Sequence, residues 1–160
     1  MATANSNLSV YDPPEVPSGS DYTIALVVSE WNCHVTEPLF KGAYDTLIKH
    51  GVLISNISRT NVPGSFELIY GAKHAQNTGV DAVVVIGSVI QGETKHFDFV
   101  CQGVVQGIKD LNIQSDIPVI FCVLTDNNLQ QALDRSGGKH GNKGVEAAVA
   151  ALKMASLSKQ

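Results

Sequence analysis

The stretch from Gln91 to His96 carries the residue types and spacing best suited to chemistry. Gly92 permits unusual backbone angles, and Glu93 and Thr94 can present free N–H groups at the start of a helix. An anion could dock on such a helix start, where the Thr94 hydroxyl would add a further contact. The stretch lacks the Walker A and G-x-G-x-x-G patterns, which disfavours a nucleoside triphosphate or a dinucleotide. On spacing alone, an ordinary helix start bonded to water is an equal alternative.

His96 stands where the chain is expected to enter this helix. An imidazole beside an anion site can donate or accept a proton near neutral pH. The alternative for a lone histidine is a simple hydrogen bond to a backbone carbonyl. That alternative is stronger still for the other histidines, which are His34, His50, His74 and His140.

Aromatic and cationic side chains elsewhere could contact a flat, charged ligand. Trp31, the only tryptophan, follows an apolar run and could either stack on a heterocycle or cap the core. Phe66 and Phe121 lie in or beside apolar patterns, which favours core roles for both. Arg135 begins a glycine-rich stretch that ends at Gly144. Its guanidinium suits bidentate contact with phosphate, although an exposed basic turn has the same composition.

Length and composition limit the class of protein. The 160 residues are the size of one domain, and 44% hydrophobic with 16% charged residues excludes a disordered chain. A net charge of −4 without a basic cluster disfavours nucleic acid as a partner. The longest apolar runs, 82–86 and 117–124, are too short to cross a membrane. The first twenty residues do not form a secretory signal pattern, so we expect a cytoplasmic protein.

The three cysteines, Cys33, Cys101 and Cys122, show no C-x-x-C spacing. This argues against both a disulfide framework and a zinc site. We therefore expect each cysteine to be a small buried or half-buried hydrophobe.

Apolar, β-branched runs predict strands at 23–28, 52–57, 82–87 and 118–124. Helices are predicted from Pro38, in a first turn, to a stop at Gly51, from Ser65 as N-cap to 77, and over 96–112, 128–134 and 142–155. Strands joined by single helices run parallel, and wholly apolar strands are covered on both faces. The pattern predicts a flavodoxin-like three-layer α/β/α sandwich with a four-stranded parallel sheet.

Prolines at 13, 14 and 17 predict an extended N-terminal arm over 1–21, followed by a single domain over 22–160. The arm could add a strand to the sheet of a neighbouring subunit. Within the domain, ligands of an open parallel sheet bind at the carboxyl ends of its strands. This rule selects the loops 29–33, 59–65, 88–96 and 125–128, and it predicts a small-molecule anion site there.

Three motifs at these places carry a family resemblance: VPGSFE at 62–67, IQGETKHFD at 90–98 and GKHGNKG at 138–144. Together, in this order, they resemble the 6,7-dimethyl-8-ribityllumazine synthases of riboflavin biosynthesis, over about residues 22–152. The resemblance implies condensation of 5-amino-6-(D-ribitylamino)uracil with 3,4-dihydroxy-2-butanone 4-phosphate, with release of phosphate and water. It also implies that neither a metal nor an organic cofactor takes part.

The resemblance implies a pyrimidine subsite in which Trp31 stacks on the ring. The other residues that it places there are Ser65, Phe66 and Glu67, then Ser88, Val89 and Ile90 through their backbone, and Phe121.

At the phosphate end, the resemblance implies binding by Glu93 and Thr94, proton transfer by His96, and a cationic contact from Arg135. Arg135 would reach the site of an adjacent subunit in a pentamer. Many family members have a small residue where this chain has Glu93, so we expect its side chain to turn away and its N–H to bind. Many also have arginine where this chain has Glu30, which reverses the local charge.

Two other classes of protein stay open at this point. The pocket could belong to a non-catalytic flavin- or lumazine-binding module, although a binder has no need of His96 beside a phosphate site. The chain could also serve mainly as a subunit of a self-assembling shell. Free pentamers and icosahedral capsids of sixty subunits both occur in the family, and the sequence does not decide between them.

Overall fold

The structure is a computed structural model that describes residues 7–158 of the chain. Its centre is a parallel sheet in the order β2-β1-β3-β4. The strands are β1 (Ile24–Ser29), β2 (Ile57–Val62), β3 (Ala82–Ile90) and β4 (Val119–Asp126).

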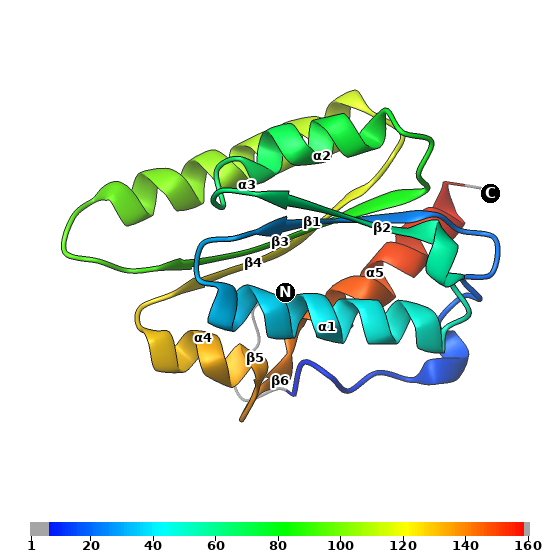
Figure 1. Ribbon diagram of the computed structural model, residues 1–160, viewed down its shortest axis with the longest axis horizontal. Helices are drawn as coiled ribbons and strands as arrows, with labels where there is room; N and C mark the ends of the chain where they lie inside the picture. The colour runs from blue at the N-terminus through cyan, green and yellow to red at the C-terminus, as the bar shows by residue number, and fades with distance from the viewer. Residues whose placement is uncertain (1–6, 159–160) are drawn as a thin grey trace.

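Helices cover both faces of this sheet (Figure 1). One face carries α2 (Leu68–Gln76) and α3 (His96–Gln114), and the other carries α1 (Cys33–Lys49), α4 (Leu129–Arg135) and α5 (Lys143–Leu157). This arrangement confirms the predicted three-layer α/β/α fold with a four-stranded parallel sheet.

The central strands β1 and β3 are apolar along most of their length because their side chains enter two separate cores. Leu26 of β1 packs with Leu39 and Leu152 on the α1 and α5 side. The next residue, Val27, packs with Leu68 on the α2 side. Successive side chains of a strand point to opposite faces, so a strand with helices on both sides is apolar except near its carboxyl end.

The predicted second strand, 52–57, was wrong. Residues Ile54–Asn56 form a short 3-10 helix, and β2 begins at Ile57 and continues to Val62 through residues predicted as loop. β2 is an edge strand, and residues 58–61 are exposed. A strand with exposed side chains does not need an apolar run, so the mostly polar residues 59–62 resemble the loop that follows a strand.

Two helix starts also differ from the prediction. α1 begins at Cys33 and contains Pro38 in its second turn, at the cost of the hydrogen bond to the carbonyl of His34. α2 begins at Leu68 rather than at Ser65, and no side chain caps it. The hydroxyl of Ser65 is therefore free for another role. The predicted helices at 96–112, 128–134 and 142–155 are present with small shifts, as α3, α4 and α5.

The glycine-rich stretch after α4 forms a small antiparallel pair, β5 (Ser136–Gly138) and β6 (Gly141–Asn142), which was not predicted. Asn142 accepts a hydrogen bond from the Gly144 N–H at 2.8 Å and donates one to the carbonyl of Pro38 at 2.9 Å. The first turn of α5 is thus joined to α1. The two helices meet closely, because a Cβ at Gly144 would lie 1.9 Å from the Leu39 carbonyl oxygen.

The described part of the N-terminal arm, residues 7–21, lies against its own chain. The Leu8 N–H donates to the carbonyl of His140 at 2.8 Å, and the Gly19 N–H donates to that of His50 at 2.7 Å. Apart from one 3-10 turn, η1 (Pro13–Glu15), residues 7–21 form turns and irregular backbone. Residues 1–6 of the predicted arm lie outside the described residues, and the added strand in a neighbouring sheet stays a prediction.

The cysteines differ in exposure. Cys122 is buried and Cys101 is half-buried, as predicted, but Cys33 is exposed because it begins α1 at the open edge of the sheet. Between residues 7 and 158, no helix combines the length and the apolar character that crossing a bilayer requires.

Candidate active site

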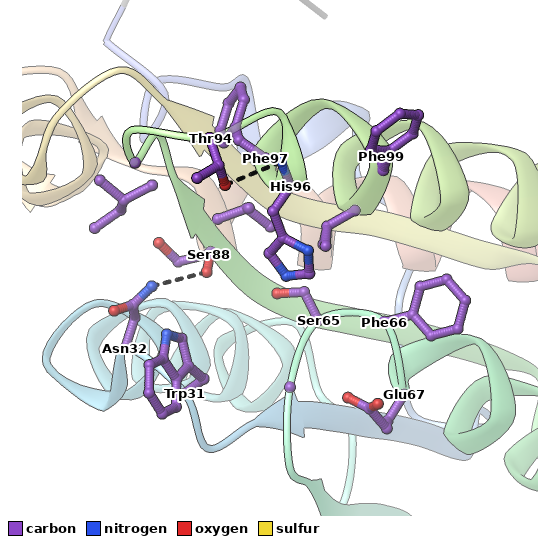
Figure 2. A pocket seen from close by; sticks show the side chains of 15 residues that line it. Trp31, Asn32, Ser65, Phe66, Glu67, Ser88, Thr94, His96, Phe97 and Phe99 are labelled. Atoms are coloured by element: carbon purple, nitrogen blue, oxygen red, sulfur yellow. Dashed lines mark hydrogen bonds between the residues drawn. The ribbon is translucent and has the colours of Figure 1, made fainter.

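A cavity of about 870 Å³ opens at the carboxyl ends of β1 and β3. Its walls are the loop after β1, the loop between β2 and α2, the end of β3 and the first turns of α3 (Figure 2). The cavity lies where an open parallel sheet places its ligands.

Most of the residues predicted for the site line this cavity. Residues from four separate segments meet there: Trp31 after β1; Ser65, Phe66 and Glu67 before α2; Ser88, Val89 and Ile90 at the end of β3; and Thr94 and His96 at the start of α3.

Backbone hydrogen bonds hold the exposed indole of Trp31 at the cavity. The Trp31 N–H donates to the carbonyl of Pro63 at 3.1 Å, which extends the pairing of β1 with β2 beyond the strands. The Ser29 hydroxyl donates to the Trp31 carbonyl at 3.4 Å, and the buried Thr36 hydroxyl donates to the Ser29 carbonyl at 2.9 Å. Trp31 is 72% exposed and lines the cavity, so a ligand there can reach its indole.

His96 and Trp31 approach the cavity from different sides. His96 is the first residue of α3, and its backbone N–H donates to the Thr94 hydroxyl at 3.4 Å. In Figure 2, its imidazole points toward Ser65 across the cavity from Trp31. A ligand in the cavity would lie between an aromatic surface and a group that can exchange a proton.

Two serine residues that line the cavity have buried hydroxyls. The Oγ atoms of Ser65 and Ser88 have no hydrogen-bond partner in the described part of the chain. Buried hydroxyls are nearly always paired, and both residues line the cavity.

Comparison with known proteins identifies the family of this chain. The family model described as 6,7-dimethyl-8-ribityllumazine synthase matches residues 21–159. The chain belongs to the 6,7-dimethyl-8-ribityllumazine synthase family.

Individual relatives agree over nearly the whole chain. The 6,7-dimethyl-8-ribityllumazine synthase of Christiangramia forsetii is 64% identical over 99% of this chain and 96% of its own. That of Flavobacterium johnsoniae is 65% identical over 100% and 85%, respectively. That of Porphyromonas gingivalis is 56% identical over 99% of both chains. The family resemblance predicted from the three motifs is confirmed, as is an enzyme of this type.

Three residues to which the lumazine synthase resemblance gave binding roles lie outside the cavity. Glu93 is exposed between the lining residues Gly92 and Thr94. Phe121 of β4 is half-buried against the core beneath α2 and α3. Arg135 ends α4, where its guanidinium donates to the Gln131 carbonyl at 3.2 Å. Their roles stay predictions.

The prediction missed several lining residues, among them Asn32, Phe97, Phe99 and Val100. A signal for two of them was available, because Phe99 and Val100 lie three and four positions after His96 and so share its face of the helix. Asn32 directly follows Trp31, and asparagine is one of the residue types most often found with a left-handed backbone.

Two of the three cysteines, Cys101 and Cys122, have raised thiol pKa values, and neither lines the cavity. Burial, followed by the charge of Asp98, raises the pKa of the Cys101 thiol. Burial raises the pKa of Cys122 to about 12. Both thiols are protonated at neutral pH, so neither is suited to nucleophilic attack. This agrees with a lumazine synthase reaction that depends on orientation and proton transfer.

Proposed function

We propose that this cavity is where the chain condenses 5-amino-6-(D-ribitylamino)uracil with 3,4-dihydroxy-2-butanone 4-phosphate. The product is 6,7-dimethyl-8-ribityllumazine, and phosphate and water are released. The observation that carries the proposal is the meeting of Trp31, Ser65 and His96, from three distant segments, in one cavity at the carboxyl edge of the sheet. Membership of the lumazine synthase family supports the same reaction.

The pyrimidine would bind against the indole of Trp31. The exposed ring offers a flat apolar face, and the unpartnered hydroxyls of Ser65 and Ser88 offer hydrogen bonds to polar atoms. Glu67, at the start of α2, is placed to accept hydrogen bonds from the ribityl hydroxyls. Phe66 would border the same ligand.

The phosphate of the four-carbon substrate would bind at the start of α3. Backbone N–H groups before a helix carry a partial positive charge, and Thr94 lines the cavity there. Glu93 would contribute its N–H, because its side chain is exposed and does not line the cavity. Arg135 lies outside the cavity of its own chain, which is consistent with a contact to the phosphate in an adjacent subunit.

The chemistry needs orientation and a modest proton shuttle. An amine of the pyrimidine attacks the ketone, phosphate leaves, and a ring closes. Holding both substrates in one cavity converts this into an intramolecular step, which is a large source of rate acceleration. His96 would move protons between the attacking amine and the leaving oxygen atoms. It would be the catalytic residue.

Self-association would complete such a site. Phe66, Tyr70 and Phe99, on or beside α2 and α3, are 55%, 76% and 69% exposed, and exposed aromatic clusters of this kind mark protein contacts. A homopentamer, and possible closure into a sixty-subunit capsid, follow from the family resemblance.

We place the protein in the cytoplasm, with an arm over 1–21 and one domain over 22–160.

Family membership does not favour the alternative of a non-catalytic flavin- or lumazine-binding module. One assay distinguishes the enzyme from the binding module. Protein that binds flavin but forms no lumazine from the two substrates would indicate the binding module.

The decisive experiment mixes purified protein with both substrates and follows the fluorescent lumazine. We expect a rate well above the spontaneous background, a reduced but measurable kcat for His96→Ala, and a raised KM for the phosphate substrate in Arg135→Ala. A rate equal to background would overturn the proposed function. An unchanged KM in Arg135→Ala would remove Arg135 from the site.

A further inference from the structure

Asn32 has an unusual backbone at the mouth of the cavity. With φ of 59° and ψ of 43°, it is the single non-glycine residue with positive φ among residues 7–158. Asparagine is one of the few L-residues that adopt this left-handed conformation readily. The conformation turns the chain sharply between Trp31 and the first turn of α1.

The side chain of Asn32 does not cap the helix that it precedes. No capping hydrogen bond forms from its side chain, although its carbonyl accepts from the N–H groups of Val35 and Thr36 at 2.8 and 3.1 Å. Its Nδ2 instead donates to the carbonyl of Ser88 at 3.0 Å (Figure 2). The bond joins the loop after β1 to the end of β3, between residues that are 56 positions apart.

From these contacts we infer that Asn32 is a positioning residue that sets the place of the Trp31 indole over the cavity. The backbone of Trp31 is bonded to Pro63 on the β2 side, and Asn32 bonds to Ser88 on the β3 side. The indole is thus carried on a loop held from both neighbouring strands. The consequence for binding rests on the proposed stacking role of Trp31.

The same bond also shapes what Ser88 can offer a ligand. Asn32 occupies one acceptor position of the Ser88 carbonyl, whereas the Ser88 hydroxyl is buried and unpartnered. Loss of the Asn32 amide would free that carbonyl and loosen the indole together. The loosened indole would weaken binding of the pyrimidine, and the phosphate end at α3 would be untouched.

The test uses Asn32→Gly, which keeps the left-handed backbone accessible and removes only the side chain. Because Trp31 is the only tryptophan, its fluorescence reports on this loop alone. We expect faster decay of Trp31 fluorescence anisotropy in the unliganded protein. We also expect about a tenfold higher KM for the pyrimidine, because the loosened indole must be ordered when the ligand binds, with kcat and the phosphate substrate's KM unchanged.

Asn32→Asp is the second variant, because it retains the shape of the side chain and replaces the donor with an acceptor that faces the Ser88 carbonyl. It should show the same changes. Asn77→Gly is the matched control, since Asn77 likewise donates from Nδ2 to a backbone carbonyl, that of Lys73, at 2.9 Å at the far end of α2. It should leave the anisotropy and both KM values unchanged.

Wild-type anisotropy and pyrimidine KM in both Asn32→Gly and Asn32→Asp would overturn the inference. The anisotropy is measured without substrate, so it separates this inference from the proposed function. If wild-type protein formed no lumazine, the proposed function would fail, and faster anisotropy decay in the variants would still support the positioning of Trp31 by Asn32.

Discussion

Gly87 of β3 and Ser65 share one small space beside the cavity. A Cβ at position 87 would lie 2.8 Å from the Ser65 hydroxyl oxygen and 2.8 Å from a terminal methyl carbon of Leu68. The missing side chain of Gly87 is therefore what lets the Ser65 hydroxyl sit against the sheet. Backbone strain plays no part, because Gly87 does not have a positive φ.

Gly87→Ala should destabilise the protein and weaken substrate binding together. Real Cβ atoms are not found under 3.0 Å from such neighbours, so Ser65 and Leu68 must move, and overpacking of this kind costs about 1–3 kcal/mol. Denaturant unfolding and the pyrimidine KM measure the two effects. Gly92→Ala is the control for stability, because a Cβ there meets nothing within 4 Å. Equal unfolding of the two variants would contradict the packing argument.

Ser88→Ala should separate stability from binding. The Ser88 hydroxyl is buried and unpartnered in the free protein, so its removal should raise the free energy of unfolding by up to about 1 kcal/mol. The same change should raise the pyrimidine KM by roughly tenfold, because the ligand loses a hydrogen bond. Thermal unfolding and steady-state kinetics measure the pair of effects. A destabilised variant with normal KM would show that the hydroxyl serves the fold instead.

Asp126→Asn should stabilise the protein at neutral pH and have little effect in acid. Burial raises the pKa of the Asp126 carboxyl, and Arg135 offsets this only in part across 3.8 Å. A raised carboxyl pKa means that the neutral form is favoured on folding, so stability is present below the ordinary value of 3.8 and is lost as pH rises.

The half-exposed Arg135 is a weak partner at that distance. Removing the buried charge of Asp126 should therefore stabilise the protein more than losing the ion pair with Arg135 destabilises it. We expect a gain at pH 7 that disappears in acid, measured by denaturant unfolding across pH. A pH-independent difference between Asp126→Asn and wild type would refute the linkage.

His50 should make the protein less stable as the solution is acidified. Burial, and then the charge of Lys49, lowers the pKa of His50, whose Nε2 lies 3.1 Å from the Tyr11 hydroxyl of the arm. A lowered histidine pKa gives stability that is present above the ordinary value of 6.5 and is lost as pH falls. The protection factors of amides around Tyr11, which correct for the intrinsic pH dependence of hydrogen exchange, should therefore fall between pH 7.5 and 5.5. His50→Gln should show no such pH dependence in this segment.

Much of the site could be predicted from the sequence because it lies at strand ends. The apolar runs of β1, β3 and β4 were found, and the carboxyl-edge rule then selected the loops that contain Trp31, Ser65 and His96. The position of β2 was missed because an edge strand with exposed side chains lacks the apolar run that marks a covered strand. The pattern of apolar residues in a short segment indicates how far a strand is buried, and β2 is only partly buried.

The alternation of strands and helices, the parallel sheet and the edge that carries the cavity were determined by sequence alone, since they depend on periodicity within short segments. The direction of each side chain at that edge was decided by the tertiary structure. Ser65 packs its hydroxyl beside Gly87 at the wall of the cavity instead of capping α2, and Asn32 reaches a carbonyl 56 residues away. Such contacts join segments that meet only after folding, so no local spacing encodes them.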